Sequence, residues 1–403
     1  MRKIPVIITL MILLLSPIDV TAETTTPISS TKETPTITIT PEDSAEISKG
    51  IPVVCLPGVY LQQPSDCILV GPSLFLTSMA RIGLFLPIRP LPTINPDPEL
   101  SKMSATYVTA SKESIPLFDS LSAAESMSAS QTLGPGLKYL SINERLDLNN
   151  VIYYHLRSGE WVEGASAGTG CCIYSGRFQG LIFKKTPSSD FGWFVEEAWS
   201  RVAPDYAAAS TSYHYYRENV ATVYDIRKVG DTEWLMIGPD EWVERRLIKR
   251  VLVNTTPPTG MTGNRWIEVN LDEQTLAVYD QGQLVYATLI ASGMSPFYTR
   301  PGLFQIQQKK EFETMSGAFE ADRSDFYYLE DVPWTMYYDE NRALHGAYWR
   351  TVFGYPQSHG CVNLAPGDAH WLFDWAKEGE WVYVWDPSGK TPTDPSYYGP
   401  GGA

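Results

Sequence analysis

Two short segments near the C-terminal end carry most of the residues of this chain that can perform acyl transfer. The first contains His345 and Gly346, and the second runs from Ser358 to Asn363 and reads Ser-His-Gly-Cys-Val-Asn. A thiol becomes an effective nucleophile when a neighbouring imidazole lowers its pKa or accepts its proton. His345 precedes Cys361 by 16 residues, a spacing at which two adjacent strands, or a strand and a loop, can bring them together. The pattern predicts a cysteine nucleophile with a histidine base.

The same residues also have a purely structural interpretation. An isolated Cys is usually a small buried hydrophobe, and an isolated His is usually a hydrogen-bonded polar group. Here two His-Gly pairs, at 345–346 and 359–360, precede Cys361, and this combination favours catalysis over a structural role. Gly360 lets the backbone bend before Cys361 and exposes amides for an oxyanion hole. The order His before Cys argues against a papain-like protease, where the Cys comes first.

Residues 264–386 resemble the L,D-transpeptidase catalytic domain, also called YkuD-like. The signature of that family is a His, a spacer of a dozen or more residues, and then Ser/Thr-His-Gly-Cys-hydrophobic-Asn. Here His345 is followed by twelve residues and then by Ser358 to Asn363, so every position matches. The resemblance covers about 30% of the chain. It implies that Cys361 is the nucleophile, that His345 is the proton acceptor and donor, and that the backbone carbonyl of Gly346 orients the imidazole.

The resemblance also implies supporting roles for neighbours of these residues. The predicted pocket and oxyanion residues are Ser358, His359, Gly360 and Asn363. The predicted substrate-binding residues are Tyr348, Trp349 and Arg350, with packing in the core or at the rim as the alternative. Asp331 to Trp334 lies in a segment that often forms a lid in relatives, and we expect a loop there.

The implied reaction begins when Cys361 attacks the carbonyl that joins the third, diamino residue of a peptidoglycan stem tetrapeptide to its terminal D-Ala. D-Ala leaves and a thioester remains, which the amine of a second stem attacks to give a 3→3 cross-link. Water as the acceptor would make the enzyme an L,D-carboxypeptidase. No cofactor is needed. A non-catalytic cell-wall-binding protein is the alternative from another functional class, and the intact Cys361, His345 and Gly360 disfavour it.

The elements that must position these residues are mainly β-strands. Short alternating runs separated by tight polar turns predict five strands in the catalytic domain: 267–271, 275–279, 284–290, 302–307 and 381–385. A helix is expected from Pro366, with Asp368 near its positive end and Trp371, Leu372 and Trp375 on its apolar face. The expected fold is a β-sandwich or barrel with a helix.

Upstream of the linker at 255–263, an internal echo indicates two copies of one small module. Strand 151–156 is followed by Trp161 in a Glu-Trp-Val-Glu run, and strand 233–237 is followed by Trp242 in the same run. These segments resemble bacterial SH3-like modules, which we assign to residues 104–170 and 171–255. Such modules bind wall peptides or act as spacers.

The N-terminal region predicts export. Residues 1–22 combine Arg2 and Lys3, an apolar run and small residues before a cleavage point, as in a signal peptide. Residues 23–49 are rich in Thr, Ser and Pro and are expected to be a disordered linker. Residues 50–103 form a segment with a predicted Cys55–Cys67 disulfide, whereas the state of Cys171 and Cys172 stays open. Residues 387–403 are expected to be a flexible tail.

The charge and composition of the chain disfavour nucleic acid and metal ions as partners and a membrane-spanning segment in the mature chain. The net charge is −15, and nucleic-acid binding depends on basic residues that neutralise phosphates. No CxxC, HxH or HExxH spacing indicates a metal site. No stretch after the predicted signal peptide is apolar enough to span a membrane. We therefore expect a secreted enzyme of the cell envelope, outside the cytoplasmic membrane, with peptidoglycan stem peptides as its partner.

Overall fold

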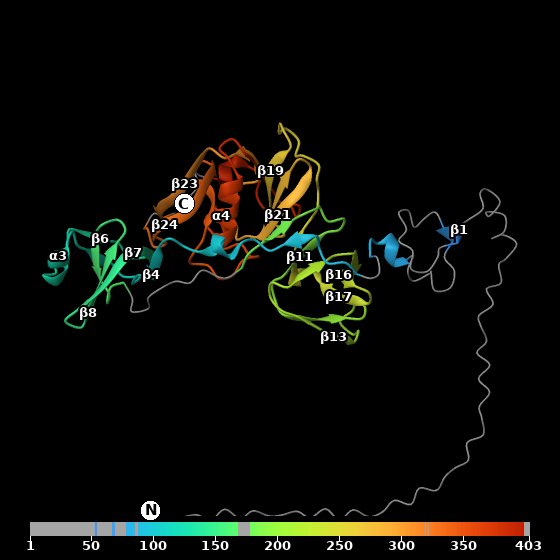
Figure 1. Ribbon diagram of the computed structural model, residues 1–403, viewed down its shortest axis with the longest axis horizontal. Coiled ribbons are helices and arrows are strands. Elements are labelled where there is room, and N and C mark those ends of the chain that lie inside the picture. Colours follow the sequence, from blue (N-terminus) through green and yellow to red (C-terminus); the bar gives the residue numbers. More distant parts are fainter. Residues whose placement is uncertain are drawn as a thin grey trace, which may run out of the picture. The chain divides into compact units, whose positions relative to one another are not determined.

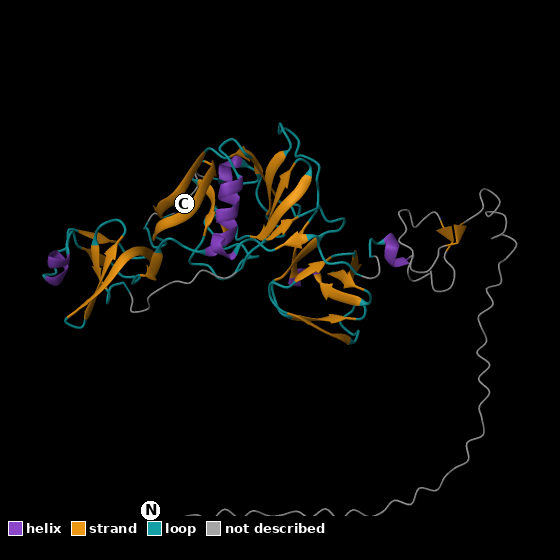
Figure 2. Cartoon of the chain, viewed as in Figure 1, coloured by secondary structure: helices purple, strands orange, loops and turns teal. Residues whose placement is uncertain are grey.

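The computed structural model describes residues 53–54, 67–68, 78–84, 88–167, 178–318, 320 and 322–398. Strands dominate these residues, as the sequence predicts (Figure 2). The predicted signal peptide at 1–22 and the linker at 23–49 lie outside the described residues. So do Cys55, Cys171 and Cys172, and the predicted disulfide therefore stays a prediction. The first short strands are β1 (Val53–Val54) and β2 (Cys67–Ile68).

The catalytic region contains a seven-stranded sheet. In spatial order its strands are β22 (Gly302–Gln305), β27 (Trp381–Trp385), β19 (Arg265–Asn270), β20 (Thr275–Asp280), β21 (Gln283–Leu289), β10 (Leu181–Phe183) and β3 (Thr93–Ile94). All five strands predicted for this region are present within one or two residues of their expected ends. Strands β10 and β3 extend the sheet beyond them, although the sequence assigns these residues to the second module and to the Cys-bridged segment.

An eight-stranded sheet carries the chemistry-bearing segments. Its main path is β26 (Val362–Leu364), β25 (Arg342–Gly346), β24 (Tyr327–Asp339), β7 (Leu137–Leu148), β8 (Val151–Leu156) and β9 (Trp161–Glu163). Two further strands join it, with β23 (Gln308–Gly317) pairing with β24 and β4 (Thr106–Thr109) pairing with β7. The lid loop expected at 331–334 is wrong, because these residues belong to β24. Positive φ angles at Asp331 and Trp334 bend the strand there, which explains the loop-like sequence.

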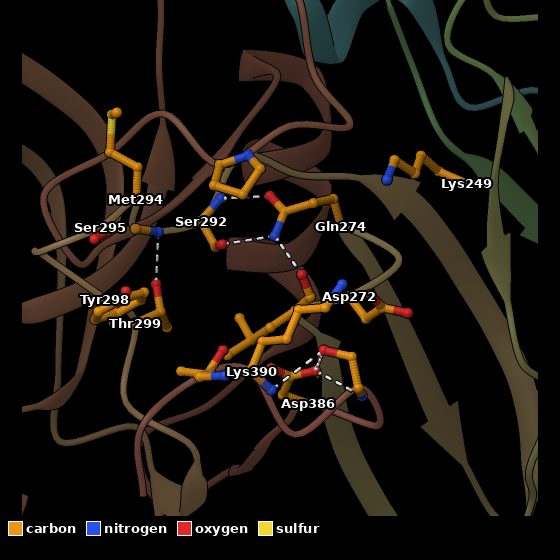
Figure 3. A pocket seen from close by; sticks show the side chains of 15 residues that line it. Lys249, Asp272, Gln274, Ser292, Met294, Ser295, Tyr298, Thr299, Asp386 and Lys390 are labelled. Atoms are coloured by element: carbon orange, nitrogen blue, oxygen red, sulfur yellow. Dashed lines mark hydrogen bonds between the residues drawn. The ribbon is translucent and has the colours of Figure 1, made fainter. Parts of the chain in front are cut away.

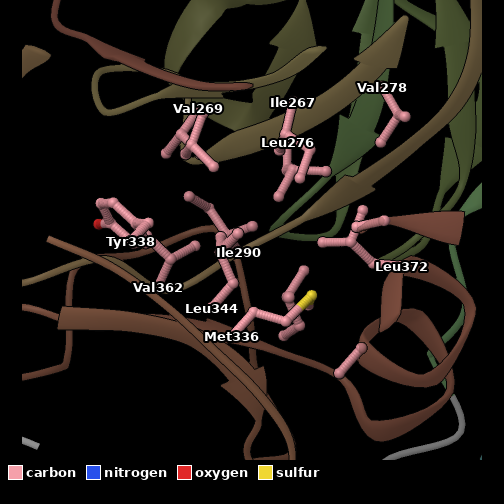
Figure 4. Close-up of a cluster of buried hydrophobic side chains, with 14 of the residues drawn as sticks. Ile267, Val269, Leu276, Val278, Ile290, Met336, Tyr338, Leu344, Val362 and Leu372 are labelled. Carbon is pink, nitrogen blue, oxygen red and sulfur yellow. The ribbon is translucent and has the colours of Figure 1, made fainter. Parts of the chain in front are cut away.

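The two sheets share one hydrophobic core, so the catalytic region is a β-sandwich (Figure 4). Val269 and Leu276 from the seven-stranded sheet lie in this core with Met336 and Leu344 from the eight-stranded sheet. Helix α4 (Pro366–Trp375) adds Leu372. Non-polar side chains removed from water in this way provide the main driving force for joining the sheets.

Helix α4 begins at Pro366 as predicted, but Asp368 does more than face the positive helix end. Its carboxylate is buried and accepts hydrogen bonds from the hydroxyl of Tyr286 at 2.7 Å and from the backbone amide of Gly180 at 2.8 Å. The hydroxyl of Thr288 donates a third hydrogen bond. Burial raises the pKa of Asp368 to about 6, and the three donors oppose that rise. This one side chain therefore ties the helix to β21 and to residue 180.

Two smaller strand-rich bodies precede the catalytic region. The first is built on β4, β7, β8 and β9 and adds β5 (Ile115–Leu117), α3 (Leu121–Glu125) and β6 (Gln131–Leu133). The second contains a three-stranded sheet of β14 (Val220–Thr222), β11 (Phe191–Phe194) and β18 (Ile248–Val251). It also contains a five-stranded sheet of β13 (Ser210–Tyr215), β12 (Ala198–Arg201), β17 (Glu241–Glu244), β16 (Thr232–Gly238) and β15 (Asp225–Val229). In the part of the chain that the structure describes, the short 3₁₀ helices are η3 (Pro98–Ser101), η4 (Arg245–Leu247) and η5 (Pro395–Tyr397).

The internal echo of the sequence corresponds to two hairpins of equal register. In the first, His155 lies opposite Trp161, and in the second Met236 lies opposite Trp242. The surroundings differ, because Trp242 is buried whereas Trp161 is half-buried and stacks on His155 at 4.6 Å. The repeated sequence thus produces a repeated hairpin, while the SH3-like resemblance of the whole modules stays a prediction.

The described part of the predicted flexible tail packs on the catalytic region. The ring of Tyr398 lies 5.3 Å from the guanidinium of Arg342, and its hydroxyl donates to the carbonyl of Pro392. Arg342 also pairs with Asp339, with 3.1 Å between Nη1 and Oδ2. Asp339 is the last residue of β24, and Arg342 is the first residue of β25, the strand that carries His345.

Among the described residues, no helix is long and apolar enough to span a bilayer.

Candidate active site

Parallel pairing of two short strands aligns the two chemistry-bearing segments. In the register of β25 with β26, Leu344 lies opposite Val362 and His345 lies opposite Asn363. Cys361 directly precedes β26, and its sulfur accepts a hydrogen bond from the backbone amide of Ala343 at 3.4 Å. Side chains two residues apart on a strand point to the same face, so Ala343 and His345 share one side of β25. The spacing of 16 residues is thus realised as two neighbouring parallel strands.

A cavity of about 340 Å³ collects most of the predicted site residues. Those that line it are His345, Trp349, Arg350, Ser358, His359, Cys361 and Asn363. Lining residues that the sequence analysis did not assign to the site are Leu137, Tyr139, Met315, Tyr327, Leu329 and Gln357. Tyr348 is not among the lining residues: it is fully buried and stacks on Tyr107 with 3.6 Å between ring centroids. Its predicted role in binding substrate therefore gives way to the alternative of core packing.

The imidazole of His345 is held at both ring nitrogens. Nδ1 lies 3.2 Å from the carbonyl oxygen of Gly346, the contact expected from the sequence. Nε2 lies 2.9 Å from Nδ2 of Asn363. A carbonyl can only accept a hydrogen bond, so Nδ1 carries the proton and Nε2 presents its lone pair. The ring is therefore held as a neutral proton acceptor at Nε2.

Arg350 determines which way the Asn363 amide points. Its Nε donates to Oδ1 of Asn363 at 2.6 Å, which leaves Nδ2 to face His345. The two terminal nitrogens of Arg350 donate to Gln357, at 3.0 Å to Oε1 and 2.6 Å to the backbone carbonyl. Burial lowers the pKa of Arg350 to about 10. This value is still well above 7, so the guanidinium is charged at neutral pH. The order Arg350, Asn363, His345 is a chain of donors that ends at the lone pair of the imidazole.

Burial keeps both reacting groups uncharged. The Cys361 thiol is 3% exposed, and its burial raises the pKa to about 11, although the Ala343 amide and the Arg342 charge oppose the rise. Burial lowers the pKa of His345 to about 4, with Gly346 opposing this shift and Arg350 adding to it. The thiol also donates to the carbonyl of Asn341 at 3.8 Å. The resting site is a neutral thiol beside a neutral imidazole.

The loop before Cys361 is closed by its own hydrogen bonds. The hydroxyl of Ser358 donates to the carbonyl of Cys361 and accepts from the amide of Gly360 at 3.2 Å. Gly360 has a φ of 121°, a conformation that favours glycine. Thr299 donates to the Gly360 carbonyl at 2.9 Å. Ser358 and Gly360 therefore shape the turn that presents the thiol.

His359 faces the cavity between two rings. Its imidazole stacks on Tyr327 with 5.9 Å between centroids and lies 4.9 Å from Phe297. Burial lowers its pKa. In this position the His359 ring forms part of the cavity wall and packs against aromatic groups.

A second cavity, of about 300 Å³ (Figure 3), is lined in part by Pro356, two residues before Ser358. Gln274 and Ser292 lie at its wall and exchange two hydrogen bonds, at 2.6 Å and 2.9 Å. The carbonyl of Ser292 accepts the amides of Gln357 at 2.8 Å and Ser358 at 3.0 Å. These hydrogen bonds attach the start of the Ser358–Asn363 segment to Ser292. Within the described residues, no group of three or more His, Cys, Asp and Glu side chains is arranged to hold a metal ion.

Comparison with known proteins identifies the domain that contains this cavity. Residues 264–384 match the family model described as the L,D-transpeptidase catalytic domain (YkuD). These residues form an L,D-transpeptidase catalytic domain. The resemblance predicted from the Ser358–Asn363 run is thereby confirmed for this part of the chain.

Relatives with the same domain differ in how much of this chain they cover. The putative L,D-transpeptidase YciB of Bacillus subtilis (strain 168) is 23% identical over 197 residues, which span 44% of this chain and 85% of that protein. The structure of the Ldtfm–avibactam carbamoyl enzyme is 28% identical with a TM-score of 0.29 and covers 31% of this chain, which spans about half (49%) of that one. The catalytic domain from the Enterococcus faecium L,D-transpeptidase is 29% identical with a TM-score of 0.28, covering 31% of this chain and 100% of that domain.

One prediction about this site follows from the donor chain. Replacing Arg350 with Ala frees Oδ1 of Asn363, so the amide can rotate and force the proton of His345 onto Nε2. We expect catalysis to fall by about 10²-fold, less than the roughly 10⁴-fold that an enforced wrong tautomer costs in a Ser-His-Asp triad. Nitrogen-15 NMR of the His345 ring reports the tautomer directly. Arg227→Ala, at an exposed arginine of β15, is the matched control.

An Arg350→Ala variant that loses activity while the His345 ring keeps its proton on Nδ1 would show that Arg350 acts in another way. Arg350→Lys separates charge from geometry, because a lysine cannot reproduce the three donor contacts of the guanidinium.

Proposed function

We propose that this chain is an exported L,D-transpeptidase that forms a thioester on Cys361 with peptidoglycan stem tetrapeptides. The observation that carries the proposal is a neutral imidazole, with its lone pair at Nε2, that lines the same cavity as the thiol of Cys361. This arrangement lies within the L,D-transpeptidase catalytic domain at residues 264–384. The apolar N-terminal run supports export, because it has the composition of a signal peptide.

The first half of the reaction uses the neutral pair. As the thiol approaches the scissile carbonyl, its proton passes to Nε2 of His345, and the sulfur attacks the carbon next to the terminal D-Ala. The imidazolium then protonates the departing D-Ala amine, which leaves the stem tripeptide as a thioester on Cys361. During this step, Nε2 gives up the hydrogen bond that it accepts from the Asn363 amide and takes the proton of the thiol. The carbonyl of Gly346 stabilises the charged ring through Nδ1, as the orienting group does in other triads.

The second half needs an acceptor amine. The side-chain amine of another stem loses a proton to His345 and attacks the thioester, which gives a 3→3 cross-link and restores the thiol. Water in place of the amine gives an L,D-carboxypeptidase with the same first half. The SH3-like resemblance of residues 104–170 and 171–255 supports a role of these modules in contact with the wall or as spacers.

Product analysis with defined stems tests the proposal. The full chain is incubated with a stem tetrapeptide, with and without a separate acceptor amine, and the products are identified by mass spectrometry. We expect D-Ala release in both cases and a cross-linked product when the acceptor is present. D-Ala release with only the hydrolysed tripeptide as product would identify a carboxypeptidase. The absence of release together with the absence of a Cys361 adduct with a carbapenem would identify a non-catalytic protein.

A further inference from the structure

Part of the active-site cavity is built by a strand outside the L,D-transpeptidase catalytic domain. Leu137 and Tyr139 lie on β7, more than a hundred residues before the start of the domain match at 264, and both line the cavity that contains Cys361. With Met315, Leu329 and Trp349 they make the apolar part of its lining. The polar groups of the lining come from His345 on β25, from Arg350 and from residues 357–363. The cavity thus combines a reactive polar side with an apolar wall.

Strand β7 reaches this position by direct parallel pairing with β24 (Figure 1). Leu137 lies opposite Tyr327, and Tyr139 lies opposite Leu329. The amide of Leu137 donates to the carbonyl of Phe326 at 2.9 Å. Backbone hydrogen bonds therefore fix β7 in register with a strand of the catalytic sheet, which is a stronger attachment than side-chain contact alone.

The turn before β7 is built for this close approach. Gly136 has a φ of 135°, and a Cβ there would lie 2.1 Å from the carbonyl oxygen of Phe326, so only glycine fits. Lys138 points to the opposite face from Leu137 and Tyr139, is fully buried, and donates to the carbonyls of Gly134 at 2.8 Å and Gly136 at 3.0 Å. Its ammonium group holds the turn closed. Contacts on both faces of β7 therefore fix the positions of Leu137 and Tyr139.

Tyr139 contacts the residues that follow the catalytic histidine candidate. Its ring lies 6.1 Å from Trp349 at an angle of 27° and 6.1 Å from Tyr348 at 83°. Trp349 in turn lies 5.8 Å from the ring of His345. Leu137 remains 37% exposed although it is apolar, and Tyr139 and Trp349 are half-buried. An apolar surface left partly open beside a reactive pair is suited to cover the apolar part of a ligand.

We propose that Leu137 and Tyr139, together with Trp349, form an apolar subsite for the aliphatic side chain of the third residue of the acyl donor. This inference rests on the proposed function. The third residue carries the scissile carbonyl, so its side chain must lie within a few ångströms of Cys361 during attack. The wall offers methyl, methylene and ring carbons, which suit the methylene chain of a diamino acid, and a single hydroxyl, which is too little for a sugar.

A series of stems tests the subsite. Tetrapeptides with L-lysine, L-ornithine or L-2,4-diaminobutyrate at position three differ by one methylene each and keep the terminal amine. Their dissociation constants are measured by tryptophan fluorescence on the full chain carrying Cys361→Ala, which binds without turnover. We expect binding to weaken roughly fourfold for each methylene removed. In the Cys361→Ala/Tyr139→Ala and Cys361→Ala/Leu137→Ala chains we expect less than about twofold for each methylene.

Two control variants separate the subsite from a general loss of structure. Tyr139→Phe keeps the ring and is expected to keep the chain-length dependence. Tyr213→Ala removes an exposed tyrosine of β13, away from the cavity, and is expected to change nothing. An unchanged dependence in both cavity variants would overturn the subsite even if the chain with Cys361 turns the stems over. A dependence that needs Tyr139, in a chain that releases no D-Ala from any stem, would support the subsite and overturn the proposed function. Stems that do not bind at all would overturn the subsite.

Discussion

The Cys361→Ala chain is expected to release D-Ala from a stem tetrapeptide at a rate at least ~10³-fold below that of the unaltered chain. The reason is that the variant lacks the sulfur on which the proposed thioester forms, so neither hydrolysis nor transfer can start. Cys361 is buried and small, and Ala is smaller still, so the β25–β26 pairing is retained. D-Ala release is measured by mass spectrometry over a range of enzyme concentrations.

The control for this result is the fold of the variant. Circular dichroism and the thermal unfolding midpoint should match those of the unaltered chain within a few degrees, because the variant loses one sulfur atom and its weak contacts with the Ala343 amide and the Asn341 carbonyl. D-Ala release at the unaltered rate from a well-folded Cys361→Ala chain would rule out Cys361 as the nucleophile.

The His345→Ala chain is expected to form the acyl-enzyme at least ~10²-fold more slowly, which is a typical contribution of a general base. The thiol makes this loss severe, because its pKa is raised to about 11 by burial and it does not ionise at neutral pH without a base. The acylation rate is measured by rapid mixing with a carbapenem and intact-protein mass spectrometry. An acylation rate unaffected by the substitution would exclude His345 as the base.

The pH dependence of acylation gives an independent check on the same pair. The pKa of His345 is lowered to about 4, so the imidazole accepts a proton at any pH above that value and loses this ability below it. The pKa of the thiol is raised to about 11, so no second limb arises at neutral pH. We expect kcat/KM to be flat between about pH 5 and pH 10 and to fall on the acid side near pH 4. A rise with a midpoint near 6.5 would instead indicate an unshifted imidazole.

The candidate catalytic residues could be selected from the sequence because the motif that contains them is local. The distance between His345 and the Ser358–Asn363 run allowed two adjacent strands, or a strand and a loop, and the structure has the parallel strands β25 and β26 with Cys361 directly before β26. The five strands and the helix of the catalytic region were also predictable, since alternating apolar residues and tight turns determine them over short distances. The contact of His345 with the Gly346 carbonyl was implied by the resemblance to the L,D-transpeptidase catalytic domain, and the structure contains it.

The remaining parts of the site depend on contacts between residues far apart in the sequence. Nothing near Tyr139 in the chain indicates that β7 pairs with β24, because parallel pairing of distant strands leaves no local pattern. Tyr348 was predicted to bind substrate because it follows His345 closely in the sequence, but successive side chains point in different directions, and Tyr348 packs on Tyr107 instead. Arg350 was predicted to bind substrate, whereas its guanidinium is engaged by Asn363 and Gln357. Its donor pattern is visible only once these partners are in place.

Intact-protein mass spectrometry of the full chain mixed with a stem tetrapeptide tests the central claim most directly. We expect a covalent adduct that adds to the chain the mass of the tetrapeptide minus the mass of the released D-Ala molecule, located on Cys361 by peptide mapping. Addition of an acceptor amine should remove the adduct and yield the cross-linked product. Release of D-Ala without any adduct on Cys361, under conditions in which the Cys361→Ala chain is equally active, would contradict the account.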